Sequence, residues 1–402
     1  MKPVYLLSLY ILLLSPFSFS QTNEVRLFVF GHSLIDHRPP AIPTPSDETT
    51  VLHWMQDIAA EAGYGFAAGG QYGFLPQHDN LPPISQWGYD QVPGVWDMDV
   101  EPFSAAEINT VMLTVANFIQ YQPAHLPHPI DNSTTVLQST ETIFDWVDQE
   151  EDSVRFYIYA NWPEMDLQNA FPPNLPQASE ILEFHNQTTG SFLDWWVDYQ
   201  DRILLSRPQF QVRLIPVGPI ISKILRDRLP GQIPFDELYE DSDPHGRASL
   251  YFLAGMISYM AIYEEEVPAS YMPSTIVHPV IRDSLASIRA FMWRELNSFN
   301  QANGDSRVFY SSTTTHLKPE PAFAASLQIF PNPSSHSLTI KGLPPGIEIS
   351  FLSANGQQIK FVRNGTNEET SLNMQEVPAG IYLIRFYDPA SEKYVSRRWV
   401  KP

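Results

Sequence analysis

The first residue that could do chemistry is Ser33, because of what precedes it. A β-branched and aromatic run over residues 25–30, with one charge at Arg26, ends at Gly31. Such a run is typical of a buried strand in a sheet that is covered on both faces. Ligands bind beyond the carboxyl ends of strands in open α/β sheets, so this position favours a functional serine. A helix N-cap is the simpler interpretation, and the segment by itself favours it.

The second candidate is His245, which ends the stretch DSDPH at residues 241–245. An apolar run over residues 247–263 predicts a buried helix, for which Pro244 suits the first position and Asp243 the N-cap. This structural role would explain Asp243. It explains His245 less well, since a helix N-terminus disfavours a cation but tolerates a neutral histidine that acts as a base.

The composition excludes several classes of function. The chain has 402 residues, of which 45 are acidic and 24 basic, and its net charge is −21. This charge argues against nucleic acid as a partner, because phosphate binding needs a basic face. The chain contains no cysteine, which excludes thiol catalysis, disulfides and zinc–thiolate sites.

Two further stretches have a simple structural interpretation. Asp97, Asp99 and Glu101 could hold the metal of a phosphoesterase or sulfoesterase, but a solvated acidic loop is simpler because no histidine lies at ligand spacing. The glycine-rich stretch over residues 63–74 predicts a turn or a close backbone approach. The glycine-rich stretch lacks the context of a nucleotide-binding motif, and neither Gly-x-Ser-x-Gly nor HExxH occurs in the chain.

Strand and helix patterns alternate between residues 25 and 300. This alternation predicts βαβ units and a parallel sheet, and hence an α/β domain. The predicted strands cover residues 25–30, 111–118, 155–159 and 211–217, and the predicted helices cover residues 51–62, 139–148, 192–205, 247–263 and 279–300.

The two ends of the chain have a different character. Residues 1–20 have a lysine at position 2, an apolar run and a small-x-small site at 18–20, which together predict a secretory signal peptide. No run is long enough to predict a stable membrane span. Residues 311–326 begin with a Ser/Thr/Pro-rich segment and predict a linker. In residues 327–402, short alternating stretches and an Asn-Gly turn predict a small all-β sandwich.

Four short motifs, in order, resemble those of the SGNH or GDSL-type hydrolases. They are GHSL at residues 31–34, GGQ at 69–71, VANF at 115–118 and DSDPH at 241–245. The resemblance implies a three-layer α/β/α, flavodoxin-like fold over residues 22–310. It departs from the family pattern in three blocks: a histidine precedes the serine, the third block keeps only its asparagine, and the last block reads Asp-x-His.

The same resemblance implies a serine esterase. Its catalytic residues would be Ser33, His245 and an orienting acid, with Asp243 as the first choice and Asp241 as the second. The oxyanion hole would be formed by the backbone N–H groups of Ser33 and Gly70, with Gly70 preferred to Gly69, and by the side-chain amide of Asn117. A serine hydroxyl needs a base to take its proton, and an acid to orient that base. No metal and no organic cofactor is required.

Two histidines flank the serine, namely His32 and His37. Each could contact the substrate or act as a second base. We interpret both as polar residues that line the pocket, which is the simpler role.

Residues 327–402 resemble the C-terminal sorting domain of the type IX secretion route of Bacteroidota. The residues that carry this resemblance are FPNP at 330–333, NGQ at 355–357, PAGIY at 378–382 and the basic tail. The resemblance implies export across both membranes by the type IX secretion machinery, removal of the domain and no part in catalysis. We therefore expect a secreted or cell-surface protein.

Together these patterns predict a secreted serine hydrolase that cleaves carboxylic esters in a small molecule or a polysaccharide. A carbohydrate acetyl esterase is one candidate, on the grounds of extracellular placement and the breadth of the family. The alternative is a non-catalytic extracellular protein that binds a carbohydrate or a surface on a decayed SGNH fold. The altered first and third motifs give weight to this alternative.

Overall fold

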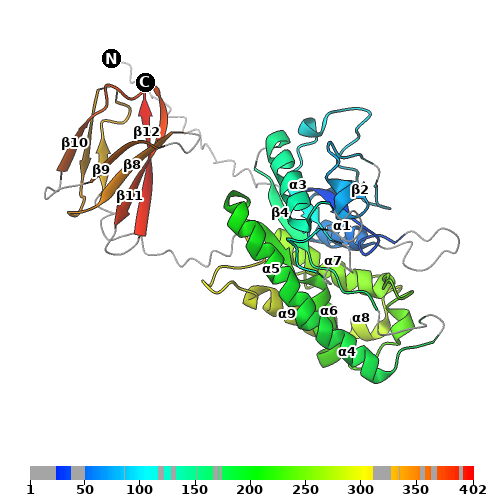
Figure 1. Cartoon of the computed structure of the whole chain (residues 1–402). Helices are drawn as coiled ribbons and strands as arrows, with labels where there is room; N and C mark the ends of the chain where they lie inside the picture. The colour runs from blue at the N-terminus through cyan, green and yellow to red at the C-terminus, as the bar shows by residue number, and fades with distance from the viewer. Residues whose placement is uncertain are drawn as a thin grey trace, which may run out of the picture. The chain divides into compact units, whose positions relative to one another are not determined.

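The computed structural model describes residues 24–37, 50–85, 87–115, 122–127, 133–151, 153–165, 171, 174–310, 327–334, 336–353, 358–363, 369–388 and 393–402. The chain divides into two compact units, Met1–Ser311 and Ser312–Pro402 (Figure 1). The predicted signal peptide and linker lie outside the described residues.

A parallel sheet of five strands forms the centre of the first unit, in the order β2-β1-β3-β4-β5. This is the order of flavodoxin-like doubly wound sheets, so the predicted α/β fold is confirmed. The strands are β1 (Val25–Gly31), β2 (Phe66–Tyr72), β3 (Thr110–Leu113), β4 (Arg155–Tyr159) and β5 (Arg213–Ile215).

Helices cover both faces of this sheet (Figure 1). Because successive side chains of a strand point to opposite faces, Val29 packs into the core that contains α1 and α7, whereas Phe30 packs into the core that contains α3 and α5. The helices are α1 (Val51–Ala62), α2 (Leu75–His78), α3 (Val136–Glu150), α4 (Ala178–Thr189), α5 (Ser191–Ser206), α6 (Val217–Lys223), α7 (Ala248–Tyr263), α8 (Pro279–Asp283) and α9 (Leu285–Ser298).

Helix α7 begins later than the sequence predicts. Its first residue is Ala248 and its N-cap is Arg247, so Pro244 and His245 lie in the loop that precedes the helix. The predicted N-cap at Asp243 is therefore wrong. As predicted, α7 is buried on nearly all sides. Its central Gly255 allows α1 to pack closely, because a Cβ at this position would lie 2.6 Å from Trp54 Cβ.

Strand β2 occupies most of the glycine-rich stretch in which we predicted a turn or a close backbone approach. The close approach is confirmed, since Gly70 pairs with Val29 and a Cβ on Gly70 would lie 2.3 Å from the Val29 carbonyl oxygen. The strand itself was not predicted. Helix α4 was not predicted either, and the predicted helix over residues 279–300 is divided into α8 and α9 at Ser284.

The second unit is all-β, as predicted. Two antiparallel sheets, β10-β7-β6 and β12-β11-β8-β9, enclose an apolar core around Phe351, Phe386 and Trp399. The strands are β6 (Gln328–Phe330), β7 (Ser337–Lys341), β8 (Glu348–Ser353), β9 (Gln358–Arg363), β10 (Glu369–Asn373), β11 (Gly380–Asp388) and β12 (Lys393–Lys401). Among the described residues, none of the helices has both the length and the apolar character that a membrane span needs.

Candidate active site

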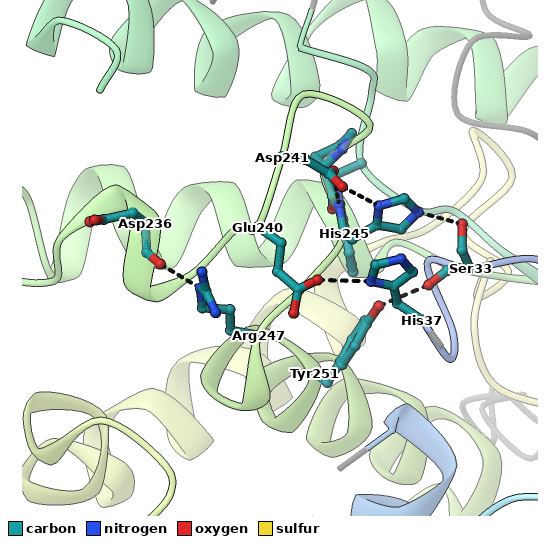
Figure 2. Close-up of polar contacts among 10 residues, drawn as sticks. Ser33, His37, Asp236, Glu240, Asp241, His245, Arg247 and Tyr251 are labelled. Atoms are coloured by element: carbon teal, nitrogen blue, oxygen red, sulfur yellow. Dashed lines mark hydrogen bonds and ion pairs between the residues drawn. The ribbon is translucent and has the colours of Figure 1, made fainter. Parts of the chain in front are cut away.

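Ser33, His245 and Asp241 form a continuous chain of hydrogen bonds (Figure 2). The Ser33 Oγ atom lies 2.8 Å from His245 Nε2, and His245 Nδ1 lies 2.7 Å from Asp241 Oδ2. Ser33 follows the carboxyl end of β1, and the other two residues belong to the loop before α7. The structure thus brings together two predicted residues that are 212 positions apart.

The acid that contacts the histidine is Asp241, and our first choice, Asp243, is wrong. Both ring nitrogens of His245 are engaged, one by Asp241 and the other by Ser33. Asp241 also accepts a hydrogen bond from the His245 backbone N–H through Oδ1, at 3.2 Å. Burial by itself would raise the pKa of Asp241, but the hydrogen bonds and the charge of His245 lower the pKa below its ordinary value. Asp241 is therefore a carboxylate at neutral pH.

The loop that carries His245 is held in place by backbone and side-chain hydrogen bonds. The Glu240 N–H donates to the carbonyl of His245 at 2.9 Å, which closes the loop. From the segment after β4, the indole N–H of Trp162 donates to the Pro244 carbonyl at 2.8 Å. These contacts fix the backbone on both sides of the imidazole.

Ser33 lies in a tight turn and not at a helix N-terminus. The Ile35 N–H donates to the His32 carbonyl at 3.0 Å, and residues 33–35 form the turn. The Tyr251 hydroxyl of α7 donates to the Ser33 carbonyl at 2.8 Å (Figure 2). The N-cap interpretation of Ser33 is therefore wrong, and its side chain faces the histidine instead.

His32 is buried beneath the turn, with an exposed fraction of 2%. Its Nε2 lies 2.8 Å from the Val115 carbonyl, and its Nδ1 accepts the Leu34 N–H at 3.4 Å. Burial lowers the pKa of His32 to about 4, so the ring is neutral and Nε2–H is the donor. His32 thus joins the end of β1 to the segment after β3, and the prediction that it lines the pocket is wrong.

His37 lies directly against the catalytic candidate. Its ring is stacked on that of His245, with centroids 3.6 Å apart and planes 7° apart. Its Nδ1 lies 2.8 Å from Glu240 Oε2. We had not predicted a role for Glu240, and the only signal in the sequence is its position next to Asp241.

The predicted oxyanion hole is not assembled as expected. Gly70 pairs with Val29 inside β2, whereas Tyr72 at the end of β2 pairs with Gly31. Gly70 thus lies within the sheet, away from the turn that carries Ser33, and its assignment as a donor is wrong. Gly69 precedes it in the same strand. Asn117 lies outside the described residues.

One group of side chains among the described residues has ligand atoms close enough for a metal ion, namely His37, Asp241 and His245, within 4.8 Å of one another. Their arrangement does not suit an ion. Imidazole lone pairs lie in the ring plane, and two stacked parallel rings cannot direct theirs to one ion at the distance of about 2 Å that metals require. The acidic residues at 97, 99 and 101 form no such group among the described residues.

Comparison with known families identifies the second unit. Residues 328–401 match the secretion system C-terminal sorting domain. The chain is therefore a substrate of the type IX secretion machinery and is secreted or located at the cell surface. A comparison with curated proteins finds no significant match.

The solved structures that match this chain include three with slight similarity. PorZ, a surface component of the type-IX secretion system of Porphyromonas gingivalis, is 21% identical over 25% of this chain, with a TM-score of 0.19, and the match spans 14% of PorZ. Two variants of an acetyl-xylooligosaccharide esterase from Geobacillus are 11% and 10% identical over 61% and 62% of this chain and 96% and 100% of theirs. Their TM-scores of 0.35 and 0.37 are too low to establish a common fold or activity.

Proposed function

We propose that the first unit is a serine hydrolase that cleaves carboxylic esters. The observation that supports this proposal is the chain of hydrogen bonds from Ser33 Oγ through His245 to Asp241. A nucleophile, a base and an acid that orients the base are the three parts that activate a serine hydroxyl. They lie at the carboxyl end of β1, where α/β sheets bind their ligands.

In the proposed reaction, Ser33 Oγ attacks the ester carbonyl carbon while His245 Nε2 takes the hydroxyl proton. The new C–O bond gives a tetrahedral intermediate, which collapses when the bond to the alcohol breaks and His245 returns the proton to the leaving alkoxide. Water then attacks the acyl-serine with the same base, and the carboxylic acid is released. Asp241 holds Nδ1–H and stabilises the imidazolium that forms in each step.

The proposed donors to the oxyanion are the backbone N–H of Ser33 and the side-chain amide of Asn117. Asn117 follows β3 in the sequence, and the strands β3 and β1 are parallel neighbours whose carboxyl ends lie at the same edge of the sheet. Removal of one such donor costs about 100- to 1000-fold in turnover. The Asn117→Ala variant should therefore lose kcat to this extent.

We propose an acetyl ester of an extracellular carbohydrate as the substrate class. The protein is exported, so its substrates are those outside the cell. Its net charge of −21 disfavours a polyanionic substrate and favours a neutral one.

The test is hydrolysis of p-nitrophenyl acetate by the purified chain, compared with Ser33→Ala and His245→Ala. Each variant should lose activity by about 10³-fold or more, because the nucleophile and the base act as one unit. Retention of the wild-type rate in both variants would contradict the proposal and leave a non-catalytic binding protein. Activity should not change after treatment with a chelator, because no step uses a metal.

A further inference from the structure

The proposed mechanism leaves a partly buried pair unused, formed by His37 and Glu240 beneath the His245 ring (Figure 2). The side chains of His37 and Glu240 are 16% and 8% exposed. His37 lies two residues after the turn that carries Ser33, and Glu240 directly precedes Asp241. Removing a carboxylate from water costs free energy unless a partner compensates for it. A contact with a purely structural role could be made at the surface without this cost.

The stack limits how the His245 ring can move. The ring makes two hydrogen bonds in its own plane, to Asp241 and to Ser33, and its remaining motion is a tilt out of that plane through rotation about its side-chain bonds. A parallel ring at 3.6 Å blocks that tilt on one face. The hydrogen bond from His37 Nδ1 to Glu240 in turn fixes the blocking ring.

A carboxylate lies beside each of the stacked rings, since Glu240 contacts His37 and Asp241 contacts His245. Glu240, Asp241 and His245 face His37 from the loop before α7, Asp36 precedes it in the chain, and the Tyr251 hydroxyl of α7 contacts the Ser33 carbonyl nearby (Figure 2). A neutral His37 that donates to Glu240 carries extra negative charge on its ring. Such a ring face attracts a cation stacked on it, as aromatic faces do in general.

We propose that His37, held by Glu240, is a positioning residue for His245. It keeps the imidazole in the plane in which Nε2 meets Ser33 Oγ, and it stabilises the imidazolium that forms when the serine is deprotonated. This inference rests on the proposed function, and it adds two residues that the Ser-His-Asp chain does not contain. It also explains why the nucleophile and the stacking ring lie only four residues apart in the chain.

Three variants separate the parts of this role. His37→Ala removes the ring and the hydrogen bond, His37→Phe keeps a ring to stack on but loses the bond, and Glu240→Gln keeps an acceptor but loses the charge. The matched controls are His125→Ala, at an exposed histidine, and Glu237→Gln, at a carboxylate 3.5 Å from His278 with 55% exposure. Thermal unfolding of every variant checks that it folds.

We expect kcat for p-nitrophenyl acetate to fall about 10- to 100-fold in His37→Ala with KM nearly unchanged, since misplacement of a base by about 1 Å has an effect of this size. His37→Phe should recover part of this loss. In Glu240→Gln the acidic limb of the pH profile should move to lower pH, because a nearby anion favours the imidazolium. The controls should match the wild type. A His37→Ala enzyme with the kcat and pH profile of His125→Ala would overturn the proposal.

A second measurement does not depend on activity. Titration of the His245 ring by NMR, with isotope-labelled histidine in the full chain, should give a lower midpoint in Glu240→Gln than in the wild type and in Glu237→Gln. Without esterase activity in the wild type, the proposed function fails, and this titration still decides the inference. An unchanged midpoint in Glu240→Gln together with an unchanged His245 shift in His37→Ala would refute it.

Discussion

At the scale of the residue, the site shows what the sequence could and could not predict. Ser33 was predictable because it follows the pattern of a buried strand, and His245 because it ends the DSDPH motif, although it was expected in the first turn of a helix and lies in the loop before α7. The choice between Asp241 and Asp243 was not, since two carboxylates two residues apart differ only in the direction that the loop gives them. The contact of His37 with His245 depends on two turns that meet only in the folded chain.

The role of Asp241 gives a direct test at this scale. Asp241→Asn should reduce kcat by about 10³- to 10⁴-fold, because an amide that donates to Nδ1 favours the wrong imidazole tautomer. The matched variant Asp243→Asn should keep most of the activity, as both ring nitrogens of His245 are already engaged. Steady-state kinetics of both variants with the same ester decide between the two carboxylates. Equal losses would contradict the assignment.

At the scale of the element, apolar runs predicted β1, β3 and β4, because strands covered on both faces are apolar on both faces. The same rule misses β2, because its glycines interrupt the apolar run that would indicate a buried strand. A glycine is required at position 70, because the backbone of β1 leaves no room there for a side chain. Helix α4 was not predicted because its apolar face is too narrow to give a clear helical pattern. Its buried residues are Phe184, His185 and Thr188.

Gly70→Ala should destabilise the first unit rather than lower kcat selectively. The added Cβ would lie 2.3 Å from the Val29 carbonyl oxygen, and overpacking of this kind costs roughly 1–3 kcal/mol or more. Gly94→Ala is the control, because nothing lies within 4 Å of the Cβ that it would add. Chemical denaturation of the two variants measures the difference. A fully stable Gly70→Ala protein with low kcat would restore Gly70 as an oxyanion donor.

The end of β12 in the second unit provides a second test at this scale. The Lys401 ammonium is buried and donates to the carbonyls of Met374, Gln375 and Val377, which uses all three of its donors. Lys401→Met should lower the free energy of unfolding of this unit by about 2–4 kcal/mol, because hydrogen bonds to a charge are strong and the carbonyls lose their partner. Lys341→Met, at a pair with Glu369 that is about half exposed, should cost less than about 1 kcal/mol. Similar losses in both variants would show that the buried ammonium has no special role.

At the scale of the whole molecule, the described residues of the first unit include three buried histidines in neutral form. Burial lowers the pKa values of His32, His78 and His185 to about 4 each, whereas the unfolded chain has the ordinary value of about 6.5. Between pH 6.5 and 4 the unfolded state therefore binds more protons than the folded state. Stability must then rise with pH through this window and, for these groups, level off above it.

The expected result is a free energy of unfolding for the first unit that falls as pH is lowered from about 7 to about 4.5. His185 allows a specific test, because it lies on α4 with Nδ1 3.1 Å from Ser222 Oγ and takes no part in the proposed chemistry. His185→Gln removes one of the three titrating groups, so the stability of the variant should depend less steeply on pH, whatever its value at pH 7. His125→Ala, at an exposed position, should leave the slope unchanged. Urea denaturation at several pH values gives both slopes, and an equal slope in wild type and His185→Gln would mean that this ring is not held neutral by its burial. Protonation of His32, which is buried beneath the turn that carries Ser33, also destabilises the folded unit. Activity should therefore be lost at low pH for two reasons, namely protonation of the base His245 and unfolding of the first unit.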